Sequence, residues 1–202
     1  MPDLALFLAA SAALTIAPGP DNLQVLARGI SQGRVAGVVA ALGFAVGCLL
    51  HTALAALGIA AALRASPVAF DAIRIAGGVY LIWIGIQALR VRGAFSLSKE
   101  GGDARKWAIF RQSVLGNVMN PKVTLFFLVF LPQFVDADSK PEIQMALLGV
   151  IFMLQTAVIF GVIGLSSGFI GQWLLRRPRT GIWLNRLAGM VFILIGVRAA
   201  LP

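Results

Sequence analysis

Long apolar runs, separated by short polar stretches, dominate this chain. Several exceed the roughly 18–20 residues that a helix needs to cross a bilayer. Backbone polar groups in lipid must pair within their own segment, so we expect each run to be helical. Six runs are recognised, at Leu4–Ala27, Val35–Leu63, Val68–Leu89, Trp107–Pro132, Ile143–Leu175 and Ile182–Leu201.

Composition supports an integral membrane protein. Of the 202 residues, 59% are hydrophobic and only 12% are charged, whereas a soluble domain carries about 25% charged residues. The chain therefore predicts a single transmembrane domain, 1–202, that is all-α. Asp3 is the only charged side chain before the first run, which we interpret as a membrane segment rather than a cleaved signal peptide. Cys48 is the only cysteine, which excludes an internal disulfide and a thiolate metal cluster.

The basic residues predict the orientation. Six spans place both termini on one side of the membrane, and most of the 17 Lys and Arg residues fall in the loops on the other side. The positive-inside rule then puts these loops in the cytoplasm and both termini outside. The net charge of +9 is explained by these loops and does not require nucleic acid. The basic residues concerned are Arg28, Arg34, Arg90, Arg92, Lys99, Arg105, Lys106, Arg111, Arg176, Arg177, Arg179 and Arg186.

The two halves of the chain resemble each other. A polar cytoplasmic linker at 92–106 separates a first three-helix repeat, 1–91, from a second, 107–202. Because three spans is an odd number, the second repeat is inserted upside down, as in many secondary transporters. Aligning the two terminal runs gives five identical pairs: Gly78/Gly189, Ile82/Ile193, Ile84/Ile195, Gly85/Gly196 and Ala88/Ala199.

The first helix of each half contains a proline break with a charge. The first break is Pro18-Gly19-Pro20-Asp21-Asn22, and the second break is Asn120-Pro121-Lys122. Proline lacks an N–H donor and glycine permits unusual dihedrals, so both helices should be interrupted. A charge at the bilayer centre costs at least ~2.5–3.5 kcal/mol, and it therefore rarely occurs without a function.

These residues suit an amino acid zwitterion. Its carboxylate could bind Lys122 and the free amides of a half-helix, and its ammonium could bind Asp21 and asparagine carbonyls. The alternative is a kink at which Asp21 and Lys122 pair only with each other. We predict substrate-binding roles for Asp21, Asn22, Asn120 and Lys122, with the break shaped by Pro18, Gly19, Pro20 and Pro121.

Two residues are candidates for proton coupling. Asp21 could release a proton when substrate binds and reload from outside. His51, the only histidine, could relay protons, or it could be a neutral core residue bonded to a helix carbonyl. Both interpretations of His51 stay open.

Glycines at four-residue spacing predict close helix packing. They are Gly29, Gly33, Gly37, Gly43 and Gly47, followed by Gly164 and Gly168.

Taken together, these motifs resemble the LysE/RhtB amino acid exporters over the whole chain. The resemblance rests on the two breaks, the glycine series, His51, Asn117, the run 80–85 (YLIWIG) and the run 130–134 (FLPQF). It adds Asn117 to the substrate-binding candidates. It also implies a bacterial inner-membrane protein whose export uses the proton motive force, and the first break is more similar to the homoserine/threonine branch.

The sequence thus predicts a secondary transporter that exports amino acids, neutral ones in particular, or their close derivatives by proton antiport. Its partners are the amino acid, protons and the lipid bilayer, with no cofactor, metal or nucleic acid, and a homodimer is compatible with the glycine-rich faces. The first alternative is cation efflux, although Asp21 is the only embedded acid and Lys122 would repel a cation. An intramembrane enzyme using Ser166 and His51, and a non-transporting scaffold, are the remaining alternatives.

Overall fold

The computed structural model describes residues 4–61, 67–90, 105–136, 139–176 and 178–200, and all regular structure in these ranges is helical. Three helices are long and apolar enough to cross a membrane alone, at Arg34–Ile59, Pro141–Leu165 and Thr180–Arg198. Two bent helix pairs meet the same criterion when each is taken as one span. The predicted linker 92–106 lies outside the described residues apart from its last two positions, and Lys106 already begins a helix.

The first bent pair consists of α1 (Leu4–Ile16) and α2 (Pro20–Gln32), which meet at 55°. Gly19 between them is fully extended, and Pro20 is the first residue of α2. Gly33 ends α2 at a φ of +89°, a conformation that side chains disfavour. This single residue therefore turns the chain directly into α3 (Arg34–Leu54).

The second bent pair begins with α6 (Lys106–Val118) and continues after a 47° bend with α7 (Pro121–Leu125). Beyond α7 the chain keeps its direction through a π-helical turn, η2 (Phe126–Phe130), and a 3-10 turn, η3 (Leu131–Phe134). The end of α3 also changes to a π-helical turn, η1 (Ala55–Ile59).

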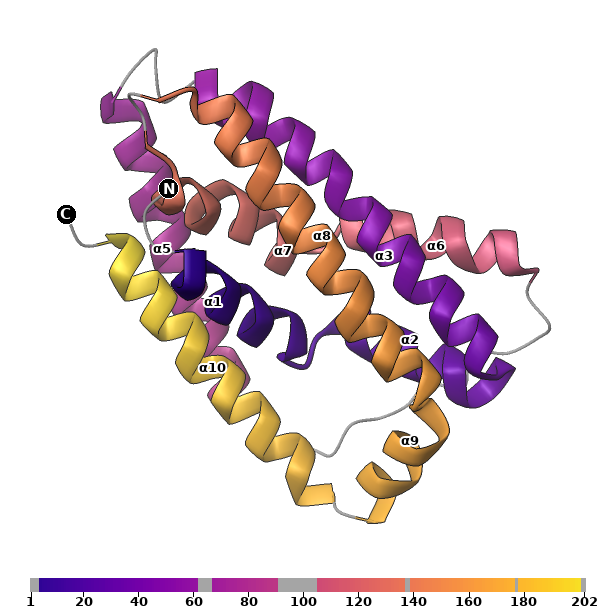
Figure 1. Ribbon diagram of the computed structural model, residues 1–202. Helices are drawn as coiled ribbons and strands as arrows, with labels where there is room; N and C mark the ends of the chain where they lie inside the picture. Colours follow the sequence, from indigo (N-terminus) through magenta and orange to yellow (C-terminus); the bar gives the residue numbers. More distant parts are fainter. Residues whose placement is uncertain (1–3, 62–66, 91–104, 137–138, 177, 201–202) are drawn as a thin grey trace.

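Helix α8 (Pro141–Leu165) lies antiparallel to α3 along much of its length (Figure 1). The two backbones approach closely at Gly37 and Gly164: a Cβ added at Gly164 would be 2.7 Å from the Gly37 carbonyl carbon. The glycine spacing therefore corresponds to a tight crossing here. The prediction is wrong for Gly33 and Gly168, because a Cβ at either position would meet open space.

A separate helix, α9 (Ser167–Arg176), follows α8 and leaves its axis (Figure 1). The sequence predicted one continuous run, Ile143–Leu175, and this is corrected. Ser166 interrupts the run with φ −93° and ψ 8°, outside the helical conformation. The 25 residues of α8 already suffice for a span, so the remaining apolar residues are free to form a second helix.

Helix α5 (Pro67–Arg90) pairs with α10 (Pro178–Ala200) on the other side of the molecule (Figure 1). The contact again uses glycines: an added Cβ would lie 2.6 Å from the Gly189 oxygen if built at Gly85, and 2.5 Å from the Gly78 oxygen if built at Gly196. Residues 68–89 are thus helical as predicted, but α5 is not among the candidate spans found by length and composition.

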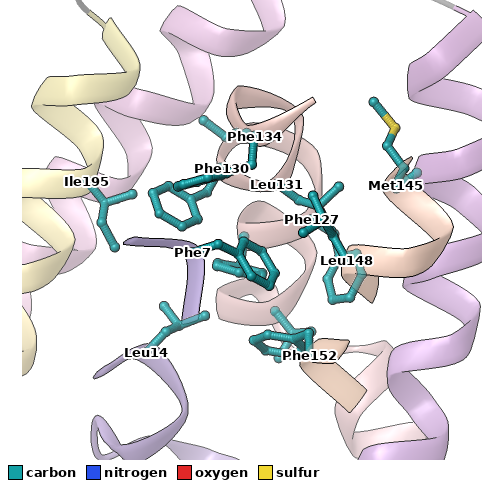
Figure 2. Packing of buried hydrophobic residues seen from close by; sticks show 14 of the residues in the cluster. Phe7, Leu14, Phe127, Phe130, Leu131, Phe134, Met145, Leu148, Phe152 and Ile195 are labelled. Atoms are coloured by element: carbon teal, nitrogen blue, oxygen red, sulfur yellow. The ribbon is translucent and has the colours of Figure 1, made fainter. Parts of the chain in front are cut away.

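An aromatic core holds the second bent pair against α1 and α8 (Figure 2). The Phe7 ring from α1 packs edge-on to Phe134, with 5.4 Å between ring centroids. Phe126 from η2 stacks on Phe152 from α8 at 4.6 Å. Because these rings are buried, they hold α1, which precedes the first break, against the segment that follows the second break.

Candidate functional site

The Asp21 carboxylate is buried where the two bent pairs meet, with only 3% of the residue exposed. It accepts a 2.7 Å hydrogen bond from the Asn120 amide and a 3.2 Å bond from the Asn117 amide. Asp21 lies in the first turn of α2, where the positive end of the helix dipole favours an anion. The first break thus presents an acid to two amides from the second half of the chain.

Prolines in the first break create carbonyl groups that need partners. In a continuous helix the Leu14 oxygen would accept from the N–H of residue 18, and the Ile16 oxygen from that of residue 20. Both of those residues are prolines without a donor. The carbonyls at the end of α1 are therefore available to side chains.

Lys122 and Asn22 supply these partners. The Lys122 ammonium donates 2.9 Å hydrogen bonds to the Leu14 and Ala17 oxygens. The Asn22 amide donates to the Thr15 oxygen at 2.7 Å and more weakly to the Ile16 oxygen. The cation thus sits at the negative end of the α1 dipole, where it is electrostatically favoured.

Gly19 leaves room for the Lys122 ammonium. A Cβ built at Gly19 would be 3.0 Å from its Nζ atom, so a side chain there would displace the cation.

The two charges do not form a direct pair. Among the residues that the structure describes, no ion pair within 4 Å joins Asp21 and Lys122. The simple kink with an internal salt bridge, which was the sequence-based alternative, therefore does not describe this arrangement. Each charge is held by uncharged groups from the opposite break.

Asn120 connects the two halves of the site. Its side-chain oxygen accepts from the Lys122 backbone N–H at 3.0 Å and caps α7, while its amide donates to Asp21. Pro121 is the first residue of α7, where its missing donor costs nothing. One asparagine thus starts the short helix and restrains the carboxylate.

A small cavity lies between the charges. Its volume is about 10 Å³, and Asp21, Lys122, Asn117 and Thr156 are among its lining residues. This is room for about one water molecule. The Asn117 side-chain oxygen and the Thr156 hydroxyl are buried without a hydrogen-bond partner among the described residues. The site is therefore closed in this conformation, and it contains polar groups that could form hydrogen bonds to a ligand.

Thr156 was not predicted from the sequence. The signal available was the pair Gln155-Thr156, two polar residues near the middle of the apolar run that forms α8. The Gln155 oxygen accepts from Ser11 on α1 at 2.6 Å, so this polar position also faces the first bent pair.

His51 is adjacent to the site, but in the part of the chain that the structure describes no hydrogen bond joins it to the Asp21 carboxylate. Its Nε2 atom lies 3.2 Å from the Asn117 main-chain oxygen, and its ring stacks on Phe127 with 5.5 Å between centroids. His51 is thus positioned against the backbone of a residue that binds Asp21.

The structure separates Ser166 from His51. The end of α8 packs on α3 at Gly37, and His51 lies 14 residues further along α3. At 1.5 Å per residue this is about 21 Å, far too long for a nucleophile and its base. Within the described ranges no three His, Cys, Asp or Glu residues gather as metal ligands would.

Comparison with known proteins decides the family. The model of the family described as LysE type translocator matches residues 12–202. The chain belongs to the LysE type translocator family. It is a multi-pass membrane protein of a family of transporters, in agreement with the resemblance found in the sequence.

Several relatives of this translocator have names that state an activity. The chain is 27% identical to the homoserine/homoserine lactone efflux protein of Salmonella typhimurium, covering 96% of this chain and 94% of the relative. It is 28% identical to the leucine efflux protein of Klebsiella pneumoniae, covering 96% and 92%. An uncharacterized membrane protein of Pseudomonas aeruginosa is 31% identical, covering 91% and 88%. No solved structure matches the translocator.

Proposed function

We propose that this protein exports neutral amino acids through the site between its two breaks. The observation that carries the proposal is the crossed arrangement of charges, with Asp21 held by second-break amides and Lys122 held by first-break carbonyls. The names of two of its relatives, a homoserine/homoserine lactone efflux protein and a leucine efflux protein, support the substrate class.

The groups at the site match an amino acid in both charge and polarity. A substrate ammonium would replace the asparagine amides on Asp21 and also bind the unpartnered Asn117 oxygen. A substrate carboxylate would draw Lys122 away from the α1 carbonyls. The residues described around the cavity include no acid or base besides Asp21 and Lys122, so the site has no partner for a charged substrate side chain. It therefore suits an amino acid whose side chain is neutral.

Binding requires the site to open. Because the cavity has room for only about one water molecule, the halves of at least one bent pair must separate before a substrate fits. The breaks at 17–19 and 119–120 interrupt backbone hydrogen bonding and provide flexible points for this motion. The structure supports alternating access from a closed state.

Proton antiport is the coupling that this site favours. Asp21 would carry a proton inward when no substrate is bound, and would lose it when a substrate ammonium arrives. His51 contacts the Asn117 backbone and is the titratable side chain placed to pass the proton on. We assign proton coupling to Asp21 and His51.

The glycine contacts of α5 and α10 support two inverted repeats. In the sequence alignment Gly85 corresponds to Gly196 and Gly78 to Gly189, so exchanging the halves turns one contact into the other. Both contacts are present, at 2.6 and 2.5 Å. A two-fold relation between the halves has this property.

The positions of the chain ends support six spans rather than five. Leu6 near the start of α1 and Arg198 near the end of α10 line the same cavity, so the ends lie on one side. An even number of crossings is needed, and α5 supplies the sixth. The α2–α3 turn lies at the opposite end of the molecule (Figure 1), where basic Arg34 begins α3. We propose that this end is cytoplasmic and that both termini face outward from a bacterial inner membrane.

Export from loaded cells tests the function. Cells that express the protein are loaded with dipeptides, and the amino acids released are measured. We expect faster efflux of neutral amino acids with the wild type, and loss of that gain with Asp21→Asn. The matched control is Asp71→Asn, because Asp71 is an exposed acid paired with Arg74 on α5.

Two outcomes would contradict the proposal. If no amino acid leaves faster, the substrate class is wrong, and a parallel assay of metal tolerance tests the cation alternative. If purified protein in vesicles exports substrate without moving protons in the opposite direction, antiport is wrong while amino acid export stands.

A further inference from the structure

A second, larger pocket lies on the other side of the second break. Its volume is about 280 Å³, close to the lower end of the ~300–1,000 Å³ typical of small-molecule sites. Both π-helical turns line it, η1 through Gly58 and η2 through Phe127 and Leu128. π-helical turns in α-helices frequently occur at functional sites.

The pocket shares a wall with the Asp21 site. His51 and Thr124 are the polar side chains in its lining. The His51 Nε2 atom lies 3.2 Å from the Asn117 main-chain oxygen, and the Thr124 hydroxyl donates to the Asn120 main-chain oxygen at 3.1 Å. These two asparagines are the residues whose amides hold Asp21. One layer of backbone therefore separates the larger pocket from the charged cavity.

The rest of the lining is apolar. Aliphatic and aromatic side chains such as Leu54, Ile59 and Phe127 form it, and the exposed lining surface is overwhelmingly hydrocarbon. Such a lining favours an aliphatic or aromatic group and disfavours a charged one, which would lose its hydration there. The charged cavity has the complementary property, because it binds charges but has no space for a side chain.

We propose that this pocket receives the apolar side chain of the transported amino acid, and that Gly58 sets the largest side chain that fits. The inference rests on the proposed export function and deepens it. When the second break opens, the substrate's ammonium and carboxylate stay at Asp21 and Lys122, and its side chain enters between η1 and η2. The ligand class is amino acids with branched aliphatic or aromatic side chains.

Gly58 offers a clean test. A Cβ built there meets nothing within 4 Å, so a larger residue would extend into the pocket without a clash in the backbone. Gly161 on α8 is a matched control, because an added Cβ there also meets open space and it does not line the pocket. Gly58→Val and Gly58→Leu give graded filling, and Gly161→Leu controls for adding the same side chain to an apolar helix.

The readout is the binding of a series of amino acids to the purified protein, measured from their effect on its thermal unfolding. Alanine, valine, leucine and phenylalanine are compared in each variant. We expect Gly58→Leu to lower the affinity for leucine relative to that for alanine by at least about tenfold. Space for a single methylene group in a hydrophobic pocket already changes selectivity by roughly 10–200-fold. Gly58→Val should have an intermediate effect, and Gly161→Leu none.

The two failures are distinguishable. If wild-type protein binds amino acids and Gly58→Leu keeps the same leucine-to-alanine ratio, the pocket is not the side-chain site and a lipid chain is its better occupant. If Gly58→Leu does not fold, Gly58→Val decides by the same ratio. If the wild type binds no amino acid in the series, the export function itself fails, and this inference fails with it.

Discussion

The Asn120 amide donates a 2.7 Å hydrogen bond to the carboxylate of Asp21, 99 residues earlier in the chain. The same side chain accepts from the Lys122 backbone and starts α7. A single residue therefore couples the conformation of the second break to the acid of the first. Any movement that opens the site must lengthen or break this bond.

Substitutions of Asn120 should separate its two roles. Asn120→Ala removes both the cap and the bond to Asp21, and we expect a loss of about 1 kcal/mol from the cap alone. Asn120→Ser keeps a capping oxygen but cannot reach the carboxylate with an amide. It should recover much of the unfolding free energy and little of the export rate. Equal export by the serine variant and the wild type would show that the bond to Asp21 is dispensable.

Removing the Lys122 ammonium should destabilise the first break. Lys122→Met keeps the length of the side chain but leaves the Leu14 and Ala17 oxygens without this donor. A buried polar group left without a partner costs about 1–3 kcal/mol, and this substitution leaves two such oxygens. Thermal unfolding of the purified protein measures the effect. Lys140→Met, at an exposed position, serves as the control and should leave the unfolding temperature unchanged.

The crossing of α3 and α8 should not tolerate a methyl group. A Cβ at Gly164 would lie within 3 Å of backbone atoms of Gly37, which cannot rotate away. We expect Gly164→Ala to destabilise the protein by about 1–3 kcal/mol, as overpacking does. Gly161→Ala, one turn earlier on the same helix, faces open space and should be neutral. Similar unfolding temperatures for both variants would argue against this close approach.

The relation between the repeats can be tested by substitution at equivalent glycines. Gly85→Ala and Gly196→Ala bring a methyl group to 2.6 and 2.5 Å from a carbonyl oxygen of the opposite helix. Each should lower the free energy of unfolding by about 1–3 kcal/mol, by the same mechanism. Unfolding of the two variants should therefore be alike. A large effect at one site and none at the other would contradict the two-fold relation.

The sequence predicted where the helices break and which charges they hold, because prolines and charges in an apolar run are conspicuous one-dimensional signals. It could not predict which groups hold those charges. Lys122 binds carbonyl oxygens at the end of α1, and main-chain oxygens carry no sequence signal of their own. The missing donor of Pro18 frees the Leu14 oxygen for Lys122, and that of Pro20 frees the Ile16 oxygen for Asn22. These absences become informative only when the neighbouring side chains are placed.

Features of the helix ends were also beyond the sequence. The division of the fifth apolar run at Ser166 and the π-helical turns η1 and η2 depend on how neighbouring helices pack, which the three apolar runs concerned do not encode. The glycine spacing correctly indicated the approach of Gly37 and Gly164, but Gly168 has the same spacing and faces open space. Gly168 lies on α9, beyond the interruption at Ser166, so it no longer belongs to the face of α8 that packs on α3.

Gly33 has a mechanical consequence. Since this one residue joins α2 to α3, the end of α2 and the start of α3 must stay close together, and a tilt of α2 would displace the start of α3. The hinge available for such a tilt is the extended residue Gly19, which lies directly beside the Lys122 ammonium. A movement that takes Asp21 away from its amides would thus also act on the close crossing of α3 and α8 at Gly37, only four residues after Gly33.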